Sequence, residues 1–343
     1  FVVVVRGGHA HVAAAVVAAP AAPAFAWGAY GHRVIGELGV QTLPQEVPAF
    51  LRAKGVDVTV GEYARELDRA KGAGRIHDTD RDPAHFADID DNGRLLGGPL
   101  LTALPPTRKD YETALRAAGT DSWQAGYLPY AMVDGWQQLV KDFNIWRVLV
   151  AAEKVTKDPA KKRFYRLDRA RREALIVRDI GVWAHYVGDA AQPLHATDHY
   201  NGWGDGPNPN GFSTARTVHA DFEGTLTQPV ASQPARVRAA MPAMQPCDCT
   251  DILPRTTAYL AQTNSKTVPV YQMFKDKTLS LGNPQGEAFI NERLAVGSAQ
   301  LRDMIVDAWR ASATMRFGYR PDMTLQDVES GKADPWLDLY GKD

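Results

Sequence analysis

Apolar residues recur at helical spacing over two long stretches of the chain. One stretch carries Val133, Trp136, Val140, Phe143 and Val150, and the other carries Ile290, Leu294, Leu301, Ile305 and Ala308. Intervals of three and four residues place side chains on one side of an α-helix. The alternation of apolar and polar residues that indicates a half-buried strand is scarce. The pattern predicts an all-α fold.

Shorter apolar patterns predict helices over residues 31–43, 173–191 and 218–226, the second of them stopped by Pro193. Gly-, Asp- and Pro-rich stretches predict long loops, which cover residues 73–93, 199–212 and 228–254. We find no internal repeat. We therefore expect a single helical domain over residues 27–315, partly irregular in its Pro-rich part at 228–285, followed by a tail at 316–343.

Composition and net charge limit which kinds of molecule and which kinds of site the sequence indicates. The chain has 343 residues, of which 45% are hydrophobic, enough to bury a full core. A formal net charge of -1 gives no global field that would attract nucleic acid or an anionic membrane, so a phosphate-bearing substrate must be held locally. The chain has two cysteines, Cys247 and Cys249. Two cysteines are too few for a disulfide framework or a cysteine zinc site, and a short local disulfide is the remaining alternative.

The first 26 residues are apolar and Ala-rich, carry a single Arg6 and end in Ala24-Phe25-Ala26. This small-x-small ending is typical of signal peptidase sites. We expect an export signal over 1–26, a mature chain beginning at Trp27, and a periplasmic or secreted location. A disordered Ala/Pro linker is the alternative. No later apolar run reaches the roughly 18 residues of a membrane span, so no transmembrane segment is expected.

The stretch "AHYVGDAAQPLH" concentrates potential metal ligands. His185 and Asp189 are four residues apart on the predicted helix and share a face, while His195 follows beyond the helix end and can fold back. His219 and Glu223 repeat the four-residue spacing in "HADFE". Either pair alone is more often an ordinary helix-surface pair. Together, imidazoles and carboxylates without thiolate are typical of catalytic zinc.

Four segments resemble a known superfamily: "WGAYGH" at 27–32, "HFADID" at 85–90, "HYVGDAAQPLH" at 185–195 and "HADFE" at 219–223. In this order they are similar to the motifs of the zinc-dependent superfamily that unites bacterial phospholipases C with fungal single-strand nucleases. The third motif is highly specific, whereas the others are weak singly. The resemblance implies an all-helical domain with three zinc ions in a cleft.

The resemblance also implies the ligands of each ion. The first zinc is held by the Trp27 amino and carbonyl groups, His32 and Asp189; the second by Asp68, His85, His185 and Asp189; the third by His195, His219 and Glu223. A carboxylate shared by two ions keeps them close enough to share one water, whose pKa they lower. The third ion then neutralises phosphate oxygens and the leaving oxygen. The implied reaction is phosphodiester hydrolysis by metal-bound hydroxide.

Asp68 is implied to orient or deprotonate the attacking water. It lies seventeen residues before His85, farther than the family usually shows, and Asp78, Asp80 and Asp82 compete for its place. We prefer Asp68 for its helical "YARELDRAK" context. Lys71 follows at the position where the nuclease branch carries an arginine that contacts phosphate. Lysine keeps the positive charge, but it lacks the paired N–H groups through which arginine binds phosphate. A solvated helix face is the other interpretation of Lys71.

The spacing from Trp27 to His32 matches the nuclease branch, whereas Glu223 and the acidic run "HFADIDDNG" are more similar to the phospholipases. We favour a nuclease or nucleotidase that acts on single-stranded nucleic acid, because Phe86 can stack a base while Asp88 accepts hydrogen bonds from its edge. Simple packing is the alternative role of Phe86.

Tyr200 and Trp203 are candidates for a cleft wall, with an ordinary loop anchor as the alternative. The second function is a phospholipase C acting on phosphatidylcholine-like lipids. A third hypothesis, from another class, is a non-catalytic helical protein stabilised by zinc. We rank it lower, because structural zinc sites tend to be closed and rich in cysteine.

Overall fold

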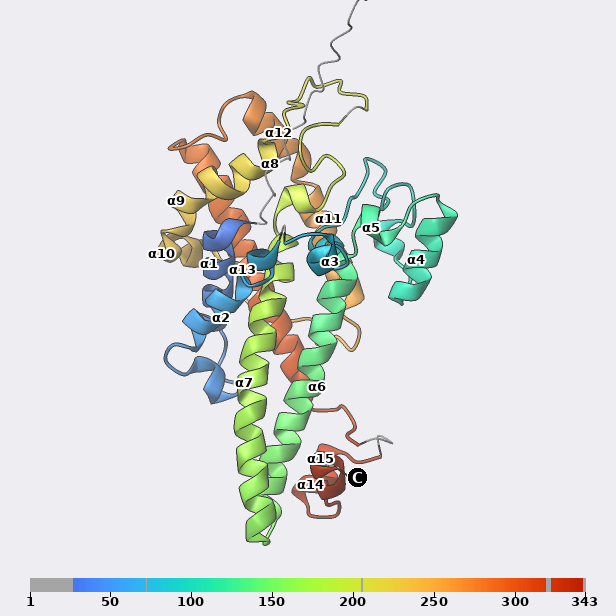
Figure 1. The fold of residues 1–343 in the computed structure, drawn as a ribbon. Coiled ribbons are helices and arrows are strands. Elements are labelled where there is room, and N and C mark those ends of the chain that lie inside the picture. Colours follow the sequence, from blue (N-terminus) through green and yellow to red (C-terminus); the bar gives the residue numbers. More distant parts are fainter. Residues whose placement is uncertain (1–26, 72, 205, 319–321, 342–343) are drawn as a thin grey trace, which may run out of the picture.

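The computed structural model describes residues 27–71, 73–204, 206–318 and 322–341 (Figure 1). The expected export signal at 1–26 lies outside the described residues. Within them the fold is all-α, as predicted: helices are joined by loops and short 3₁₀ turns, with isolated β-bridges in place of sheets. No helix in these ranges is both long and apolar enough to cross a membrane.

Three long helices form the framework: α6 (Leu128–Val155), α7 (Pro159–Asp189) and α13 (Pro284–Ala311). Helices α6 and α7 form a long hairpin, and α13 packs against both (Figure 1). Every residue of the apolar face predicted on α13 is buried. On α6 the prediction is wrong at Val150, which is 37% exposed, because toward the hairpin tip the buried side passes to Val148, Leu149 and Ala152.

Helix α7 begins at Pro159 and not near residue 173. Asp158 caps its first turn, with the side chain accepting from the backbone N–H groups of Ala160 (2.8 Å) and Lys161 (3.2 Å), and Pro159 occupies the position where a missing N–H is tolerated. The helix ends at Asp189. Pro193 then holds the preceding residue, Gln192, in an extended conformation with φ -89° and ψ 116°.

Helix α1 (Gly28–Gln41) packs closely against two neighbours, α2 (Val56–Ala64) and α13. A Cβ atom on Gly36 would lie 3.0 Å from the Cα atom of Gly61 in α2, and one on Gly39 would lie 2.6 Å from Cδ2 of Leu301 in α13. The missing side chains therefore let α1 approach both helices, which fixes the position of its first turns.

Several predicted loops contain short helices. The described chain also includes α3 (Arg75–Asp78), α4 (Arg108–Ala117), α5 (Ser122–Ala125), α8 (Val218–Ala220), α9 (Thr227–Ala231), α10 (Pro234–Ala240), α11 (Leu253–Asn264) and α12 (Thr267–Lys275). The helix predicted at 218–226 is α8 followed by a π-helical segment, Asp221–Leu226. The stretch predicted as a Pro-rich loop over 228–254 contains most of α9, all of α10 and the start of α11. The irregular part between α10 and α11 holds a disulfide between Cys247 and Cys249.

The C-terminal segment folds back onto the hairpin. Its helices α14 (Leu325–Glu329) and α15 (Trp336–Tyr340) contribute to a small second core, in which Val328 is buried beside Tyr165 of α7. The indole of Trp336 stacks on the Tyr340 ring at 4.6 Å. The expected tail is thus packed on the outer half of α6 and α7, away from the main core.

Candidate metal centre

Five side chains from four elements meet at the inner end of α7. His185 and Asp189 come from the last turns of α7, His32 from α1, Asp68 from the 3₁₀ turn Leu67–Ala70, and His85 from the 3₁₀ turn Asp82–His85. They form two overlapping groups that could each hold a metal ion, and in each group the ligand atoms lie within 4.8 Å of one another. The groups are His32, His185 and Asp189, and Asp68, His85 and His185.

The Asp189 carboxylate faces imidazoles from three elements. Its Oδ1 lies 3.4 Å from Nε2 of His32, and its Oδ2 lies 3.1 Å from Nδ1 of His85 and 3.4 Å from Nε2 of His185. Asp68 stands opposite, with its Oδ1 3.6 Å from Nε2 of His185. The resemblance gives His185 to one ion only, whereas in the structure it reaches both groups.

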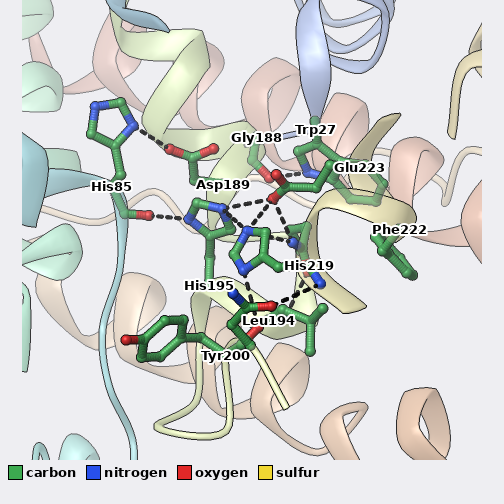
Figure 2. A network of polar contacts seen from close by, with 12 residues as sticks. Trp27, His85, Gly188, Asp189, Leu194, His195, Tyr200, His219, Phe222 and Glu223 are labelled. Atoms are coloured by element: carbon green, nitrogen blue, oxygen red, sulfur yellow. Dashed lines mark hydrogen bonds and ion pairs between the residues drawn. The ribbon is translucent and has the colours of Figure 1, made fainter. Parts of the chain in front are cut away.

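The third group consists of His195, His219 and Glu223 (Figure 2). They come from the 3₁₀ turn Pro193–His195, from α8 and from the π-helical segment, a conformation frequently found at functional sites. Oε1 of Glu223 lies 2.9 Å from Nε2 of His195 and 2.5 Å from Nε2 of His219. A His195 ring nitrogen, Nδ1, lies 2.6 Å from the carbonyl oxygen of His85, so the third group adjoins the first two.

Backbone carbonyls orient three of the imidazoles. Nδ1 of His185 donates to Ala64 (2.7 Å), Nδ1 of His195 to His85 (2.6 Å) and Nδ1 of His219 to Tyr200 (3.0 Å). A neutral imidazole with Nδ1 as the donor has its lone pair on Nε2. The Nε2 atoms of His195 and His219 lie 3.1 Å apart, so two lone pairs face each other. A cation between them removes this repulsion, and such a hydrogen bond on the far nitrogen is typical of metal-binding histidines.

The eight side chains that the resemblance implies as ligands are all buried. Burial raises the pKa of Asp68 to about 7 and holds that of Asp189 well above its usual range, while it holds the pKa values of His85 and His185 well below theirs. Burial raises the pKa of Glu223, but His219 and His195, when protonated, attract and hydrogen-bond the carboxylate, which outweighs burial and lowers its pKa to about 2.

Four carboxylate oxygens in the centre accept no hydrogen bond from any described residue: both of Asp68, Oδ1 of Asp189 and Oε2 of Glu223. Buried carboxylates are costly unless they are hydrogen-bonded, paired or bound to a metal. Carboxylate oxygens that accept no hydrogen bond, beside imidazole lone pairs and with no thiolate, make a donor set that suits a divalent ion such as zinc.

Trp27 lies against this centre. Its buried indole N–H donates to the carbonyl of Gly188 (2.6 Å; Figure 2). Its own carbonyl accepts from the backbone N–H of Gly31 (3.3 Å). The carbonyl implied as a zinc ligand thus participates in the first turn of α1. The residues before Trp27 lie outside the described part of the chain, so the proposed role of its amino group stays a prediction.

Asp68 lies on a 3₁₀ turn and not in the helix expected from its context, because α2 ends at Ala64. Lys71 places its Nζ 3.9 Å from Oδ1 of Asp68 with a side chain only 15% exposed, so it is not a solvated helix face. Of the competing aspartates, Asp80 is exposed and Asp82 half-buried, and neither belongs to a metal group. The side chain of Asp78 is outside the described residues.

The residues predicted to bind substrate differ in how accessible their side chains are. Phe86, next to His85, is half-buried with its ring against Gly126, where a Cβ atom would lie 2.7 Å from ring atom Cδ2. Asp88 is buried, and burial together with the nearby Asp198 holds its pKa well above the usual range. Tyr200 is 45% exposed, so its ring remains available to a ligand.

Trp203 is 5% exposed and stacks on His199 with ring centroids 3.8 Å apart. Its other neighbours are Phe212 and Tyr271, and its indole N–H donates to Pro207. The face that a ligand would need is covered. Trp203 is therefore a loop anchor, which is the alternative that the sequence left open, and not a cleft wall.

The sequence analysis missed Gln192. Its Nε2 donates to Oε1 of Glu223 (2.7 Å) and its Oε1 accepts from the backbone N–H of Leu194 (2.5 Å). The buried amide therefore connects the turn after α7 to the third group. Its place between Asp189 and His195, in the most specific motif, was the available signal.

No model of a known protein family matches the chain, and no curated protein matches it.

Proposed function

We propose that the protein is a zinc-dependent phosphodiester hydrolase of the superfamily that unites bacterial phospholipases C and fungal single-strand nucleases, and that it cleaves single-stranded nucleic acid or nucleotides. The observation that carries the proposal is the Asp189 carboxylate, which faces His32, His85 and His185 at 3.1–3.4 Å. A buried carboxylate with three imidazoles around it is suited to bridging two divalent ions.

The proposed ligands follow the motifs. We assign His32 and Asp189, with Trp27, to one zinc, Asp68, His85, His185 and Asp189 to a second, and His195, His219 and Glu223 to a third. Bound zinc lowers the pKa of water and neutralises charge on phosphate oxygens. The remaining catalytic tasks are positioning the water and the phosphate, and these belong to side chains.

Asp68 is the proposed group that orients the attacking water, because neither of its buried oxygens accepts a hydrogen bond from a described residue. Lys71, 3.9 Å from that carboxylate, is the proposed phosphate contact, a single positive charge at the edge of the centre. Phe86 directly follows His85 and Asp88 comes two residues later; these two are the proposed contacts to the base.

The proposal is tested with zinc analysis and two substrates, methyl 4-nitrophenyl phosphate and single-stranded DNA. We expect three zinc ions per chain, hydrolysis of both substrates, and loss of activity on dialysis against a chelator with recovery on adding zinc. His185→Ala should lose zinc and activity, whereas His77→Ala, an exposed histidine outside the metal groups, should retain both. Turnover that survives chelation, or zinc content unchanged in His185→Ala, would contradict the proposal.

One observation favours a phospholipase C as the second candidate. Burial raises the pKa of Asp88 well above its usual range, and the nearby carboxylate of Asp198 adds to the increase. Two neighbouring carboxylates near Phe86 suit a cationic choline headgroup, which also binds aromatic faces. Hydrolysis of short-chain phosphatidylcholine with negligible cleavage of single-stranded DNA would favour this candidate and leave the metal assignment unchanged.

A further inference from the structure

A cleft of about 660 Å³ lies beside the metal centre between α6, α7 and the segment before His85. Its lining includes Leu67, Ala84 and Tyr186, which are the immediate chain neighbours of Asp68, His85 and His185. The Tyr186 ring stands edge-on to the rings of His85 (5.6 Å) and His185 (6.0 Å). The cleft and the metal groups therefore share a wall.

Two arginines bring positive charge to the cleft. Arg81 and Arg108 are both exposed, and neither forms an ion pair with a carboxylate of any described residue. The guanidinium of Arg108 lies over the Tyr127 ring, 3.6 Å from its centroid, which orients it at the rim. Guanidinium groups bind phosphate in a bidentate manner, so two of them without a carboxylate partner favour an anionic ligand.

The remaining lining combines aromatic rings with a hydrogen-bond acceptor. Tyr127 and Tyr130 are buried, and their hydroxyls donate to the carbonyls of Asp80 (2.8 Å) and Pro105 (2.7 Å), whereas the Tyr186 ring is half-buried. Asp134, exposed and likewise without an ion pair in the described chain, lines the same cleft and can accept hydrogen bonds from ring N–H groups. The volume falls in the usual range of small-molecule sites, roughly 300–1,000 Å³.

We propose that this cleft binds the nucleotide adjacent to the one held at the metal centre. Its phosphate contacts Arg81 and Arg108, and its base lies beside the half-buried ring of Tyr186, where Asp134 accepts from the base edge. The inference rests on the proposed function, because it extends the substrate from a single diester to a strand. A short oligonucleotide, which reaches this cleft, is therefore expected to be a better substrate than a small ester, which reaches only the metal centre.

The test compares tetradeoxyadenylate with methyl 4-nitrophenyl phosphate on the zinc-loaded protein. In Arg81→Gln and Arg108→Gln, the ratio of kcat/KM for the oligonucleotide to that for the small ester should fall about tenfold, and the salt dependence of oligonucleotide cleavage should weaken. The matched control is Lys109→Gln, which removes the same charge from the residue next to Arg108, outside the cleft lining, and should leave the ratio unchanged. An unchanged ratio in both arginine variants would overturn the inference.

A direct binding measurement separates this inference from the proposed function. If the wild-type protein hydrolyses neither compound, the proposed function fails. The affinity for fluorescein-labelled tetradeoxyadenylate, measured by anisotropy, still decides the inference. A loss of about tenfold in both arginine variants and not in Lys109→Gln supports a nucleotide-binding cleft. Equal affinity in all four proteins would rule it out.

Discussion

The indole N–H of Trp27 donates a 2.6 Å hydrogen bond to the carbonyl of Gly188, the residue directly before Asp189. Trp27 precedes α1, which carries His32, so this bond links the two helices that supply His32 and Asp189. Trp27→Phe keeps an aromatic ring and removes this hydrogen bond, while the Gly188 carbonyl keeps its bond from the backbone N–H of Ala191 (2.8 Å). We expect a loss of about 0.5–1.5 kcal/mol in the free energy of unfolding, with weaker zinc retention.

Denaturant unfolding and zinc analysis measure both effects of Trp27→Phe. Trp123→Phe, at a tryptophan that is 59% exposed, serves as the control and should be neutral. Wild-type stability in Trp27→Phe would show that the bond does not hold α1 against α7.

Asp189→Asn keeps the shape of the side chain and removes its charge. Because the carboxylate faces imidazoles of both overlapping metal groups, we expect hydrolysis to fall by several orders of magnitude and the zinc content to drop, while the helical circular dichroism persists. Asp168→Asn, on the same helix and paired with Arg171, is the matched control. Near-normal turnover with three bound zinc ions would contradict the bridging role.

Gln192→Leu should affect one metal group selectively. The amide holds Glu223 and contacts no atom of the groups around Asp189 among the contacts described here, so we expect the third ion to be lost first. Loss of such an outer contact typically lowers metal affinity about 10–100-fold. Competition with a graded series of chelators measures the affinity of each site. Uniform weakening of all three sites would indicate a general effect on folding.

A chain that begins at Trp27 should be more active than one with residues 1–26 attached. The proposed amine ligand becomes an amide when another residue precedes it, and an amide nitrogen is a poor donor to zinc. Comparing kcat/KM and zinc content of the two chains tests the assignment. Equal values in both would exclude the Trp27 amine as a ligand.

Phe86→Ala tests the proposed base platform. Stacking contributes about 1–3 kcal/mol per base, so kcat/KM for single-stranded DNA should fall roughly tenfold or more. Duplex DNA should be a poor substrate for wild type and variant, because paired bases expose no face without being extruded. If single-stranded DNA is cleaved equally well by both proteins, Phe86 only packs against Gly126.

The apolar pattern predicts the inner half of α7 and misses its outer half. From Pro159 to residue 172 the helix buries a single apolar residue, Tyr165, and is joined to α6 by ion pairs such as Arg169–Glu153 (3.2 Å) and Arg172–Asp142 (2.6 Å). Those pairs span two helices, so their partners cannot be identified from spacing within one. The capping signal at Asp158 and Pro159 was present and would have given the correct start.

At the metal centre, the motifs correctly identify which residues come together. Predictions from the local sequence pattern are wrong at two positions, Asp68 and Trp203. Asp68 was expected in a helix, but α2 ends earlier and a 3₁₀ turn carries it. Trp203 seemed available because its loop is rich in glycine and asparagine, yet His199 and Tyr271 cover it. Tyr271, which covers part of the Trp203 ring, belongs to α12, more than sixty residues later in the chain. The sequence of the loop alone therefore does not predict this contact.

The two ends of helix α7 pack against separate groups of buried side chains. Its inner end, with His185 and Asp189, belongs to the main core, whereas its outer end rests on the small cluster around Tyr165 and Val328, with Asp334 of the C-terminal segment bonded to Lys161 and Tyr165. At about 1.5 Å per residue, the helix separates these ends by roughly 45 Å. Insertions, deletions and new surface chemistry can therefore accumulate during evolution at the hairpin tip without displacing the metal ligands. We therefore expect substitutions in the outer half of the hairpin to affect metal binding less than substitutions in its inner half.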